Sequence, residues 1–267
     1  MKEPLVKKSA IWKKIYLNLI SKRDLKGAAF IHFTAELEKK EYIESGLPLR
    51  KAVIIPNGFD VDALKLEEKE AKPRSFRLRF GINPNSKIIL FLSRISWKKG
   101  LDTLIPAFAG VNREYSQSVL VIAGGDDEGY KKNVQLQITN YKLQDKVIFT
   151  GMLTGKDRGS AFKASSVFVL PSYSENFGMA VIEAMYYKLP VVITEGVAIS
   201  EEINKAGVGI VIKKDVDELK NSILDVLKNG INTKVGVRAR NFVEKEYSSV
   251  EVAEKMEREY RLFLNYG

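Results

Sequence analysis

The sequence predicts an α/β fold, a doubly wound parallel sheet, and three observations carry this prediction. From residue 52 onward, short runs of β-branched residues alternate with amphipathic stretches of helical length. The short runs are apolar throughout, as expected of strands that are covered on both faces. The chain has 267 residues, 45% of them apolar and 10% aromatic, which is enough for a substantial hydrophobic core.

The predicted elements follow one another in chain order. The strands are expected at residues 52–55, 88–92, 119–123, 147–150, 167–170, 191–194 and 209–212. The helices between them are expected at residues 101–112, 131–141, 156–165, 179–187 and 216–229. Residues 66–74 are rich in charge and contain Pro73, so we expect a mobile loop there.

Two flanking regions lie outside this alternation. Residues 1–50 are predicted as helices rich in lysine and aromatic residues, with a short strand-like piece at residues 29–34. Residues 234–267 are predicted as two helical segments that break near Ser248 and Ser249. The second segment has an apolar stripe, which we expect to pack on this chain's own domain rather than on a partner. The stripe consists of Val250, Ala253, Met256, Tyr260 and Phe263. The sequence therefore divides into regions 1–50, 51–233 and 234–267.

Composition excludes several kinds of chemistry. The chain has no cysteine, which excludes disulfides, cysteine zinc sites and thiol catalysis. Its single histidine, His32, argues against a Ser-His-Asp triad or a multi-histidine metal site, and we interpret it as structural. The three adjacent carboxylates at residues 126–128 point in different directions, so we expect no metal there.

The net charge of +10 is compatible with a phosphorylated small molecule, an anionic membrane surface or a plain basic surface. No run of five or six basic residues occurs, so we expect no nucleic-acid partner. No apolar run reaches eighteen residues and the first residues are charged, which predicts a cytoplasmic protein. Peripheral contact with the inner face of the membrane stays open.

The loops that follow the predicted strands are the candidate ligand-binding segments, because ligands of an open parallel sheet bind outside the carboxyl ends of its strands. Most of these loops contain glycine, cations or carboxylates. They are residues 56–60, 93–100, 124–126, 151–153 and 171–178.

The loop at residues 171–178 is the most informative. Phe177 and Gly178 open a predicted helix, whose unpaired N–H groups favour phosphate, and Gly178 permits close approach of the backbone. Glu183 comes five residues later, about 7 to 8 Å along the helix, where its carboxylate could accept two hydrogen bonds from a ribose diol. Glu175 lies before the helix and would face sugar hydroxyls.

Two cations lie in the loop at residues 93–100. Arg94 and Lys99 would clamp a pyrophosphate and stabilise the charge that develops on it as a sugar–oxygen bond breaks. Either residue alone is more simply explained as a surface cation. Trp97 between them is either a lid or a surface aromatic residue, and this choice stays open.

These segments together resemble the C-terminal half of the family 4 (group 1) glycosyltransferases, which are retaining enzymes of GT-B fold. The resemblance covers residues 28–265. It is carried by the segments at 53–60, 91–94, 99–100, 149–151, 170–178 and 183–185. It implies that residues 51–233 form a Rossmann-like nucleotide-sugar donor-binding domain, one GT-B half with extra helices at both ends.

The resemblance also assigns roles by position. The implied catalytic residues are Glu175, Arg94 and Lys99. The donor phosphates and sugar would meet Arg94, Lys99, Asn176, Phe177, Gly178, Met179 and Gly58. The ribose and base would meet Glu183, Met152, Leu153 and Gly124. The donor phosphates are met by cations in this family, so no metal and no cofactor is expected.

The family has a second, N-terminal domain that binds the acceptor, and it is largely missing here. Residues 1–50 resemble only its last helices and the linker, and residues 234–267 the helices that return toward it. The implied function is transfer of a hexose from a nucleotide diphosphate sugar to an acceptor hydroxyl, with this chain supplying the donor-binding domain. The alternative is a non-catalytic, nucleotide-sugar-binding subunit of a split enzyme whose acceptor domain is a separate chain.

A third class, a sugar-nucleotide epimerase of GT-B fold, is less favoured, because it generally needs acid–base side chains that these motifs do not supply. The sequence does not fix the donor base (UDP, GDP or ADP), the donor sugar, the acceptor glycan or lipid-linked sugar, or the oligomeric state.

Overall fold

The computed structural model describes residues 22–230 and 233–264, which form two compact units. The described residues of Asn57–Val252 form the larger unit, and those of Met1–Pro56 and Ala253–Gly267 form the smaller one. The helices predicted within residues 1–21 lie outside the described residues.

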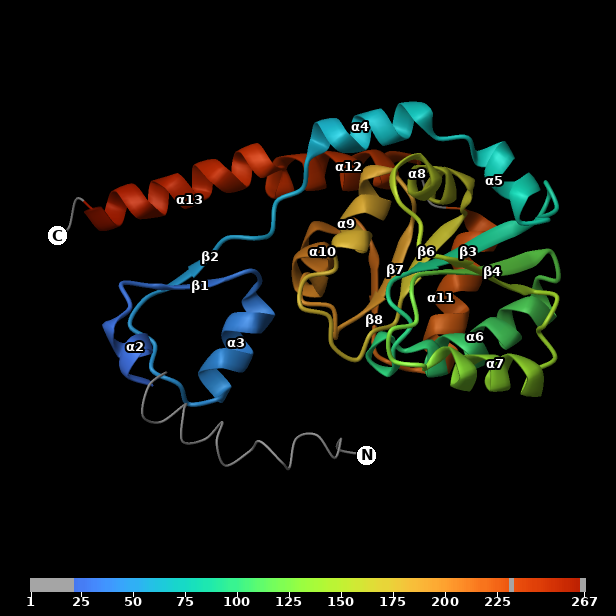
Figure 1. Ribbon diagram of the computed structural model, residues 1–267, viewed down its shortest axis with the longest axis horizontal. Helices are drawn as coiled ribbons and strands as arrows, with labels where there is room; N and C mark the ends of the chain where they lie inside the picture. The colour runs from blue at the N-terminus through green and yellow to red at the C-terminus, as the bar shows by residue number, and fades with distance from the viewer. Residues whose placement is uncertain (1–21, 231–232, 265–267) are drawn as a thin grey trace. The chain divides into compact units, whose positions relative to one another are not determined.

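The larger unit contains a six-stranded parallel sheet with the order β5-β4-β3-β6-β7-β8 (Figure 1). The strands are β3 (Lys87–Leu92), β4 (Ser118–Ala123), β5 (Val147–Gly151), β6 (Val167–Leu170), β7 (Val191–Thr194) and β8 (Ile210–Ile212). The chain starts in the middle of the sheet, runs outward through β4 and β5, and returns to the middle at β6. The order therefore reverses between β3 and β6, which is the point where sheets of this kind bind ligands.

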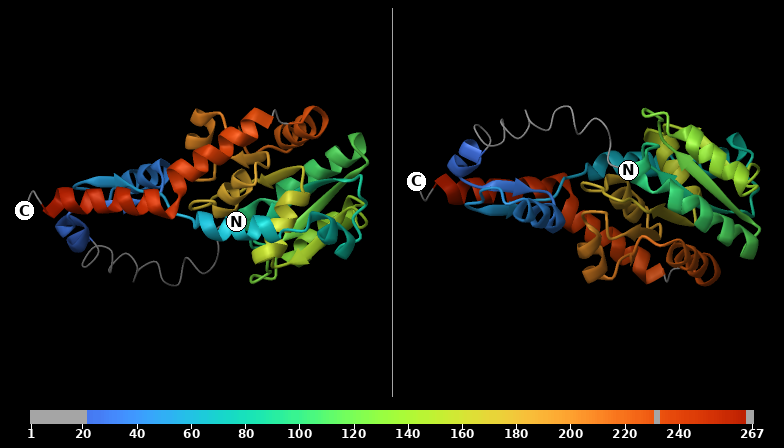
Figure 2. Two further views of the ribbon diagram at one scale, coloured as in Figure 1. Left: turned by 90° about the horizontal axis from the view of Figure 1, so that it is seen from above. Right: turned by 90° about the horizontal axis from the view of Figure 1, so that it is seen from below.

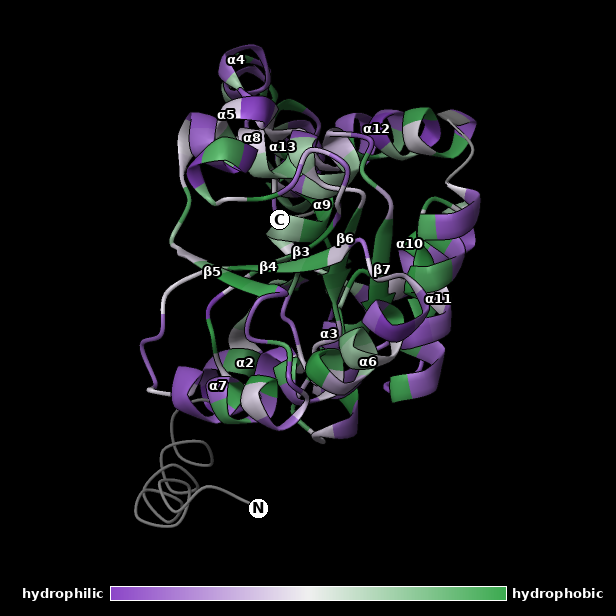
Figure 3. Cartoon of the chain, turned by 90° about the vertical axis from the view of Figure 1, so that its right-hand side faces the viewer, coloured by the Kyte–Doolittle hydropathy of each residue, from purple (hydrophilic) through white to green (hydrophobic). Residues whose placement is uncertain are grey.

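Helices cover both faces of the sheet (Figures 1 and 2). One layer contains α6 (Leu101–Glu114), α7 (Lys131–Asn140) and α11 (Val216–Asn229). The other contains α4 (Val61–Glu70), α5 (Pro73–Arg79), α8 (Gly155–Ala164), α9 (Met179–Tyr186) and α12 (Thr233–Tyr247), and the short α10 (Ser200–Ala206) packs beside β8. The strands carry hydrophobic side chains, whereas many outward helix positions are hydrophilic (Figure 3). This confirms the doubly wound α/β fold.

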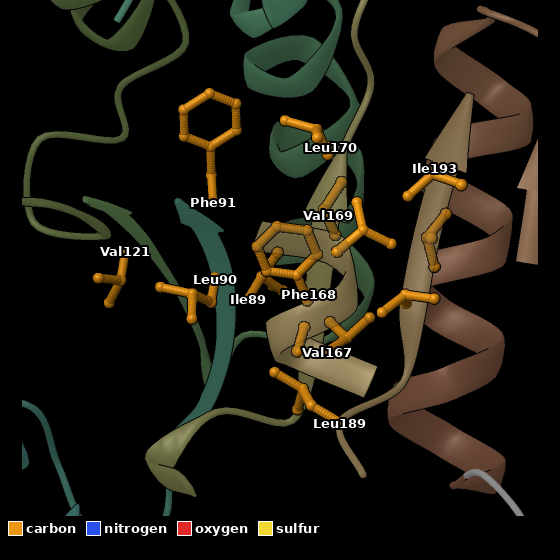
Figure 4. Close-up of a cluster of buried hydrophobic side chains, with 14 of the residues drawn as sticks. Ile89, Leu90, Phe91, Val121, Val167, Phe168, Val169, Leu170, Leu189 and Ile193 are labelled. Carbon is orange, nitrogen blue, oxygen red and sulfur yellow. The ribbon is translucent and has the colours of Figure 1, made fainter. Parts of the chain in front are cut away.

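The core of the larger unit lies on β3 and β6. Ile89, Leu90 and Phe91 of β3 and the four residues of β6 are almost fully buried, and they interleave with side chains of β4 and β7 (Figure 4). Strands this apolar on both faces are stable only between two helical layers. The burial explains why the predicted strand positions agree with the observed ones to within a residue or two.

The smaller unit contains α2 (Lys22–Gly27), β1 (Ile31–Phe33), α3 (Glu36–Glu44), β2 (Ala52–Ile54) and most of α13 (Ser249–Leu264). Its two strands form a separate parallel pair, with His32 opposite Val53. The prediction that residues 52–55 belong to the main sheet is therefore wrong. An apolar run shows that a strand is covered but not which strand pairs with it. His32 Nε2 donates a hydrogen bond to the Ile55 carbonyl at 2.6 Å.

The predicted mobile loop at residues 66–74 is also wrong, because helix α4 occupies most of it and α5 begins at Pro73. Asp60 caps α4 by accepting hydrogen bonds from the N–H groups of Asp62 and Ala63. Leu64 is buried. The charged residues of this stretch lie on the helix surface, where glutamates of α4 pair with arginines of other helices.

The C-terminal break is confirmed, since α12 ends at Tyr247 and α13 begins at Ser249. The expected packing of the apolar stripe is wrong for most of its length, because Val250, Tyr260 and Phe263 are 65%, 52% and 46% exposed. Tyr260 does make an edge contact with Phe30, 5.7 Å between ring centroids. Helical periodicity identifies an apolar face but not what covers it.

Candidate active site at the switch point of the sheet

The loops after β3 and β6 leave the sheet side by side at the switch point. Gly100 has a φ of +72°, and a Cβ atom there would lie 1.8 Å from the Pro171 carbonyl oxygen. The N–H of Tyr173 donates to the Lys98 carbonyl at 2.8 Å. Only glycine permits this approach, so the two loops are fixed to each other through their backbones.

The loop after β4 is joined to the same group. Gly124 has a φ of +155°, and a Cβ atom there would lie 1.9 Å from the Ser93 carbonyl oxygen. The Gly124 N–H donates to the Gly151 carbonyl at 2.9 Å, and the Ile95 N–H donates to the Gly125 carbonyl at 2.8 Å. Gly124 therefore has a backbone reason to be glycine, and it connects three of the predicted ligand-binding loops.

The two residues predicted to contact the base lie in the loop after β5. Met152 is 72% exposed, whereas Leu153 is buried in the core. A Cβ atom on Gly125 would lie 3.8 Å from the Met152 Cε. The structure thus brings Met152 to the Gly124 loop, with its side chain available at the surface.

The principal ion pair of these loops joins Lys99 to Glu175. The Lys99 ammonium donates to Glu175 Oε2, and the two side chains are 10% and 18% exposed. Two of the three predicted catalytic residues are therefore in contact. The third, Arg94, is exposed and has no hydrogen bond or ion pair with any residue in 22–230 or 233–264.

The backbone of Glu175 is held by the loop after β7. Its N–H donates to the Gly196 carbonyl at 2.9 Å, and its carbonyl accepts from the Ala198 N–H at 3.0 Å. These bonds form a short parallel bridge between Glu175 and Val197. Glu175 is therefore positioned by main-chain contacts, and its carboxylate by Lys99.

Helix α9 begins directly after this loop, at Gly178. Gly178 has a φ of +95° and no side chain caps the helix, so the N–H groups of the first turn are not satisfied by a side chain. Asn176 is exposed and Met179 is half-buried. Phe177 is buried and contacts Tyr247 edge-on at 5.7 Å, so its ring has a packing role. An anion would be favoured at this helix start.

Glu183, predicted to bind ribose, is buried at 9% exposure on α9 and has a partner that the sequence did not reveal. Its Oε1 accepts from Arg158 Nη1 at 2.9 Å, and Arg158 Nη2 donates to Glu67 Oε1 at 2.7 Å. Burial raises the pKa of Glu183 to about 7, an effect that Arg158 opposes and Glu67 reinforces.

Gly58 is the predicted residue that the structure does not bring to these loops. A Cβ atom on Gly58 would lie 2.9 Å from the Ser249 Cα, at the start of α13. The neighbouring Phe59 N–H donates to the Tyr247 carbonyl at 2.9 Å. Gly58 is thus connected to the site indirectly, through Phe59 and through Tyr247, which packs on Phe177.

Arg158 and Glu67 lie far from Glu183 in the sequence, and no local spacing connects them. One signal was present, because Asp60 followed by Val61 and Leu64 is the pattern of a capped helix. Predicting that helix would have placed Glu67 on a surface instead of in a loop. Which arginine it meets depends on how α4 and α8 pack.

A second cluster, centred on Tyr173, was also missed. The Tyr173 hydroxyl donates to Asp102 Oδ2 at 2.5 Å, and this bond, together with burial, raises the pKa of Tyr173 to about 12. The Lys214 ammonium lies 3.5 Å from the centroid of the Tyr173 ring. Trp97 is 41% exposed and its ring centroid lies 5.8 Å from that of Tyr173, so its side chain lies at the surface beside the candidate site.

Two other features are absent from the described residues. No helix in 22–230 or 233–264 has the length and apolar character needed to cross a membrane. In the same part of the chain, no three His, Cys, Asp or Glu side chains are grouped in a way that could hold a metal ion.

The fold and these loops define an α/β protein whose candidate ligand-binding loops meet at the switch point of a parallel sheet. The sequence model of the family described as "Glycosyl transferases group 1" matches residues 74–245. The chain therefore belongs to the group 1 glycosyl transferases.

Individual relatives agree with this family. The chain is 34% identical over 140 residues to an alpha-monoglucosyldiacylglycerol synthase of Streptococcus pneumoniae (strain ATCC BAA-255 / R6), which covers 52% of this chain and 31% of the synthase. The chain spans 55% of the length of a second curated relative and 34% of the length of a third. The chain thus spans about half or less of the length of the curated relatives it matches.

Two solved structures show the fold. Anabaena Alr3699/HepE, determined in complex with UDP-glucose, is 20% identical with a TM-score of 0.78, over 91% of this chain and 69% of that one. The C-terminal domain of a group 1 glycosyl transferase family protein (LpcC) from Francisella tularensis is 21% identical with a TM-score of 0.61, over 72% of this chain and all of that one. The second match identifies the sheet described above as one half of a GT-B fold.

Proposed function

We propose that this chain supplies the donor-binding domain of a retaining glycosyl transferase, which moves a hexose from a nucleotide diphosphate sugar to an acceptor hydroxyl. The observation that carries the proposal is the arrangement at the switch point. There the Lys99–Glu175 pair precedes the uncapped start of α9, and the buried carboxylate of Glu183 follows on the same helix. The HepE structure, which contains UDP-glucose, supports a nucleotide sugar as the ligand class.

Each part of the donor has a matching group in this proposal. The pyrophosphate lies at the start of α9, where the N–H groups of the first turn and the cations of Arg94 and Lys99 face its charge. The hexose lies against Glu175 and the ribose against Glu183. The base lies on the loop containing Met152 and Leu153, beside Gly124. Because cations and N–H groups neutralise the pyrophosphate, no metal and no cofactor enters the proposal.

Lys99 has two roles in this arrangement. Without donor it neutralises Glu175, a carboxylate that is largely removed from water. When a pyrophosphate binds, the ammonium shares its three N–H donors between the phosphate oxygens and Glu175. The pair therefore holds the Glu175 carboxylate in place before the sugar arrives.

The reaction proposed is a displacement on one face of the sugar. The bond between the anomeric carbon and the phosphate oxygen breaks, and a bond from the same carbon to the acceptor oxygen forms. The acceptor proton passes to the leaving phosphate oxygen, whose developing charge Arg94 and Lys99 stabilise. The Glu175 carboxylate stabilises the positive charge that develops on the sugar. A covalent intermediate on Glu175 is the alternative route to the same products.

Thermal-shift measurements with UDP, GDP, ADP and their sugars test donor binding. A ligand that binds only the folded chain raises its melting temperature, so at least one of these nucleotides should stabilise the wild type. The shift should be lost in Glu183→Ala and kept in Glu70→Ala, an exposed carboxylate at the end of α4. If none of the nucleotides stabilises the wild type, the proposal is wrong.

A transfer assay then separates the enzyme from a non-catalytic subunit. Transfer of sugar by this chain alone to any acceptor would exclude the non-catalytic alternative. Tight binding without transfer, with activity restored by a separate acceptor-domain chain, would support a split enzyme. In the active form, Glu175→Ala should reduce turnover strongly. Activity within a few-fold of wild type would remove Glu175 from the mechanism.

A further inference from the structure

The buried carboxylate of Glu183 is held by one guanidinium, which is itself held from a third helix. Arg158 on α8 donates from Nη1 to Glu183 Oε1 at 2.9 Å. The same guanidinium donates from Nη2 to Glu67 Oε1 at 2.7 Å and from Nε to Glu67 Oε2 at 3.3 Å. The fork toward Glu67 on α4 fixes the plane of the guanidinium, and this plane fixes the direction of the bond to Glu183.

This arrangement leaves the second oxygen of Glu183 for a ligand. Oε2 accepts no hydrogen bond from any residue in the described parts of the chain. A carboxylate that is to hold a diol must present its oxygens in a fixed direction, because a rotated carboxylate loses one of the two bonds. Arg158 supplies this fixed direction through Oε1.

The charge of Glu183 depends on the same residue. Burial favours the protonated form, and Arg158 is the positive group that opposes it. Glu67, on the far side of Arg158, favours the protonated form as well. A protonated carboxyl has one oxygen occupied by its own proton and accepts hydrogen bonds from a diol less well.

Groups on the other packed elements do not substitute for Arg158. Arg240 of α12 is directed to Glu68, Glu244 and the Tyr186 hydroxyl. Tyr187, the residue directly after α9, carries a buried hydroxyl with no hydrogen-bond partner among the described residues. Among the charged groups that act on Glu183, Arg158 is positive and Glu67 negative.

We propose that Arg158 is a positioning residue for donor binding, which holds the Glu183 carboxylate in one orientation and negatively charged. Glu67 orients the Arg158 guanidinium and reduces its effect on the charge of Glu183. This inference rests on the proposed function, since it takes Glu183 as the ribose-binding group. It assigns a part in donor recognition to α4 and α8, which carry none of the predicted site residues.

The test is the pH dependence of nucleotide-sugar affinity, measured by calorimetry from about pH 6 to about pH 9 with the donor found by thermal shift. A nucleotide sugar is suitable because its doubly esterified phosphates do not titrate in this range. In the wild type, affinity should rise with pH as Glu183 ionises. In Arg158→Gln, the rise should move to higher pH, with affinity about tenfold weaker near neutrality and largely recovered at the alkaline end.

Two further variants distinguish positioning from general stability. Glu67→Gln keeps a hydrogen-bond acceptor for Arg158 but removes a negative charge. The rise of nucleotide-sugar affinity with pH should therefore move to lower pH in this variant. Arg240→Gln removes the other arginine that holds α4 and should leave the pH dependence unchanged. If Arg158 had only a structural role, the pH at which affinity rises would shift in the same direction in Arg158→Gln and Glu67→Gln, or would shift equally in Arg240→Gln. Either result would overturn the inference.

A ligand-free measurement separates this inference from the proposed function. The ionisation of Glu183 can be followed by NMR with ¹³C-labelled glutamate, and assigned by comparison with Glu183→Gln. If the pH at which Glu183 ionises rises in Arg158→Gln and falls in Glu67→Gln, the role assigned to Arg158 is supported even if no nucleotide sugar binds. An unmoved titration overturns it even if Glu183→Ala abolishes donor binding.

Discussion

The two sides of helix α9 hold their parts of the candidate site by different means. On the loop side, residues 93–100 and 171–178 are joined through the backbone, with Gly100 against Pro171 and Glu175 bonded to the loop at Gly196. On the helix side, Glu183 is held by side-chain ion pairs that connect α9, α8 and α4. The loop side therefore depends on close backbone packing, and the helix side depends on the charges of three side chains.

This difference has consequences for how each side responds to change. A backbone approach that leaves no room for a Cβ atom admits no side chain, so the loss of stability on substitution should be large and independent of pH. A buried ion pair depends on the protonation of its members and on every neighbouring charge. The loop side should therefore be insensitive to pH and to nearby charge, whereas the helix side should respond to both.

The largest effect is expected for Gly100→Ala. Its Cβ would overlap the Pro171 carbonyl, and its positive φ is unfavourable for alanine, so unfolding should become easier by about 4 kcal/mol. Chemical denaturation measures this. Gly81→Ala is the matched control, because Gly81 has a similar φ of +64° with no atom within 4 Å, and it should lose only about 1 kcal/mol. Equal losses would show that the loops are not in close contact.

The next effect is expected for Lys99→Met, measured as donor affinity by calorimetry. The substitution removes a cation from the pyrophosphate and leaves Glu175 without its partner, so binding should weaken about a hundredfold. Lys98→Met is the control, since Lys98 is exposed and lies over the Trp97 ring, and its affinity should stay within about threefold of wild type. Similar losses in both variants would indicate that only the overall charge of the loop matters.

A smaller effect, opposite in sign, is expected for Glu183→Gln. The pKa of Glu183 rises from its ordinary 4.5 to about 7 on folding, so its contribution to stability is present below about pH 4.5 and is lost as pH rises through about 7. Glutamine does not ionise, so the variant should be more stable than wild type by about 2 kcal/mol at pH 8.

At pH 5 the two proteins should differ little, because Glu183 is then protonated in the folded wild type. Thermal or chemical unfolding at both pH values checks this. A variant that is less stable than wild type at pH 8 would show that Arg158 more than offsets the burial of Glu183.

The smallest effect is expected for Arg240→Gln. Arg240 binds Glu68 of α4 as well as the Tyr186 hydroxyl, so its loss should cost about 1 kcal/mol of stability and loosen α4 in hydrogen exchange. Arg261→Gln removes the exposed pair with Glu257 and should cost less than about 0.5 kcal/mol. If the two variants lose equal stability, α4 is not held by its ion pairs.

The sequence was most informative where burial alone decides the structure. Strands such as β3 and β6 are apolar on both faces, so their positions and the doubly wound class could be predicted from the pattern. The site loops followed, because they come directly after those strands. The run at residues 52–54 has the same appearance, yet it pairs with β1, since strand pairing depends on the path of the chain.

The helix side of the site could not be predicted in the same way. Arg158 and Glu67 reach Glu183 from helices that are far away in the sequence, and no spacing records such a contact. The charges of residues 66–70 suggested a loop, although they lie on the surface of α4 and two of them pair with half-buried arginines. Long-range ion pairs appear only once the packing of the helices is known.

A crystal structure of this chain with its tightest-binding nucleotide diphosphate tests the central claim most directly. The account predicts phosphates at the first turn of α9 near Arg94 and Lys99, with the ribose hydroxyls within hydrogen-bond distance of Glu183, which keeps its contact with Arg158. A nucleotide bound elsewhere, or one whose ribose does not approach Glu183, would contradict it.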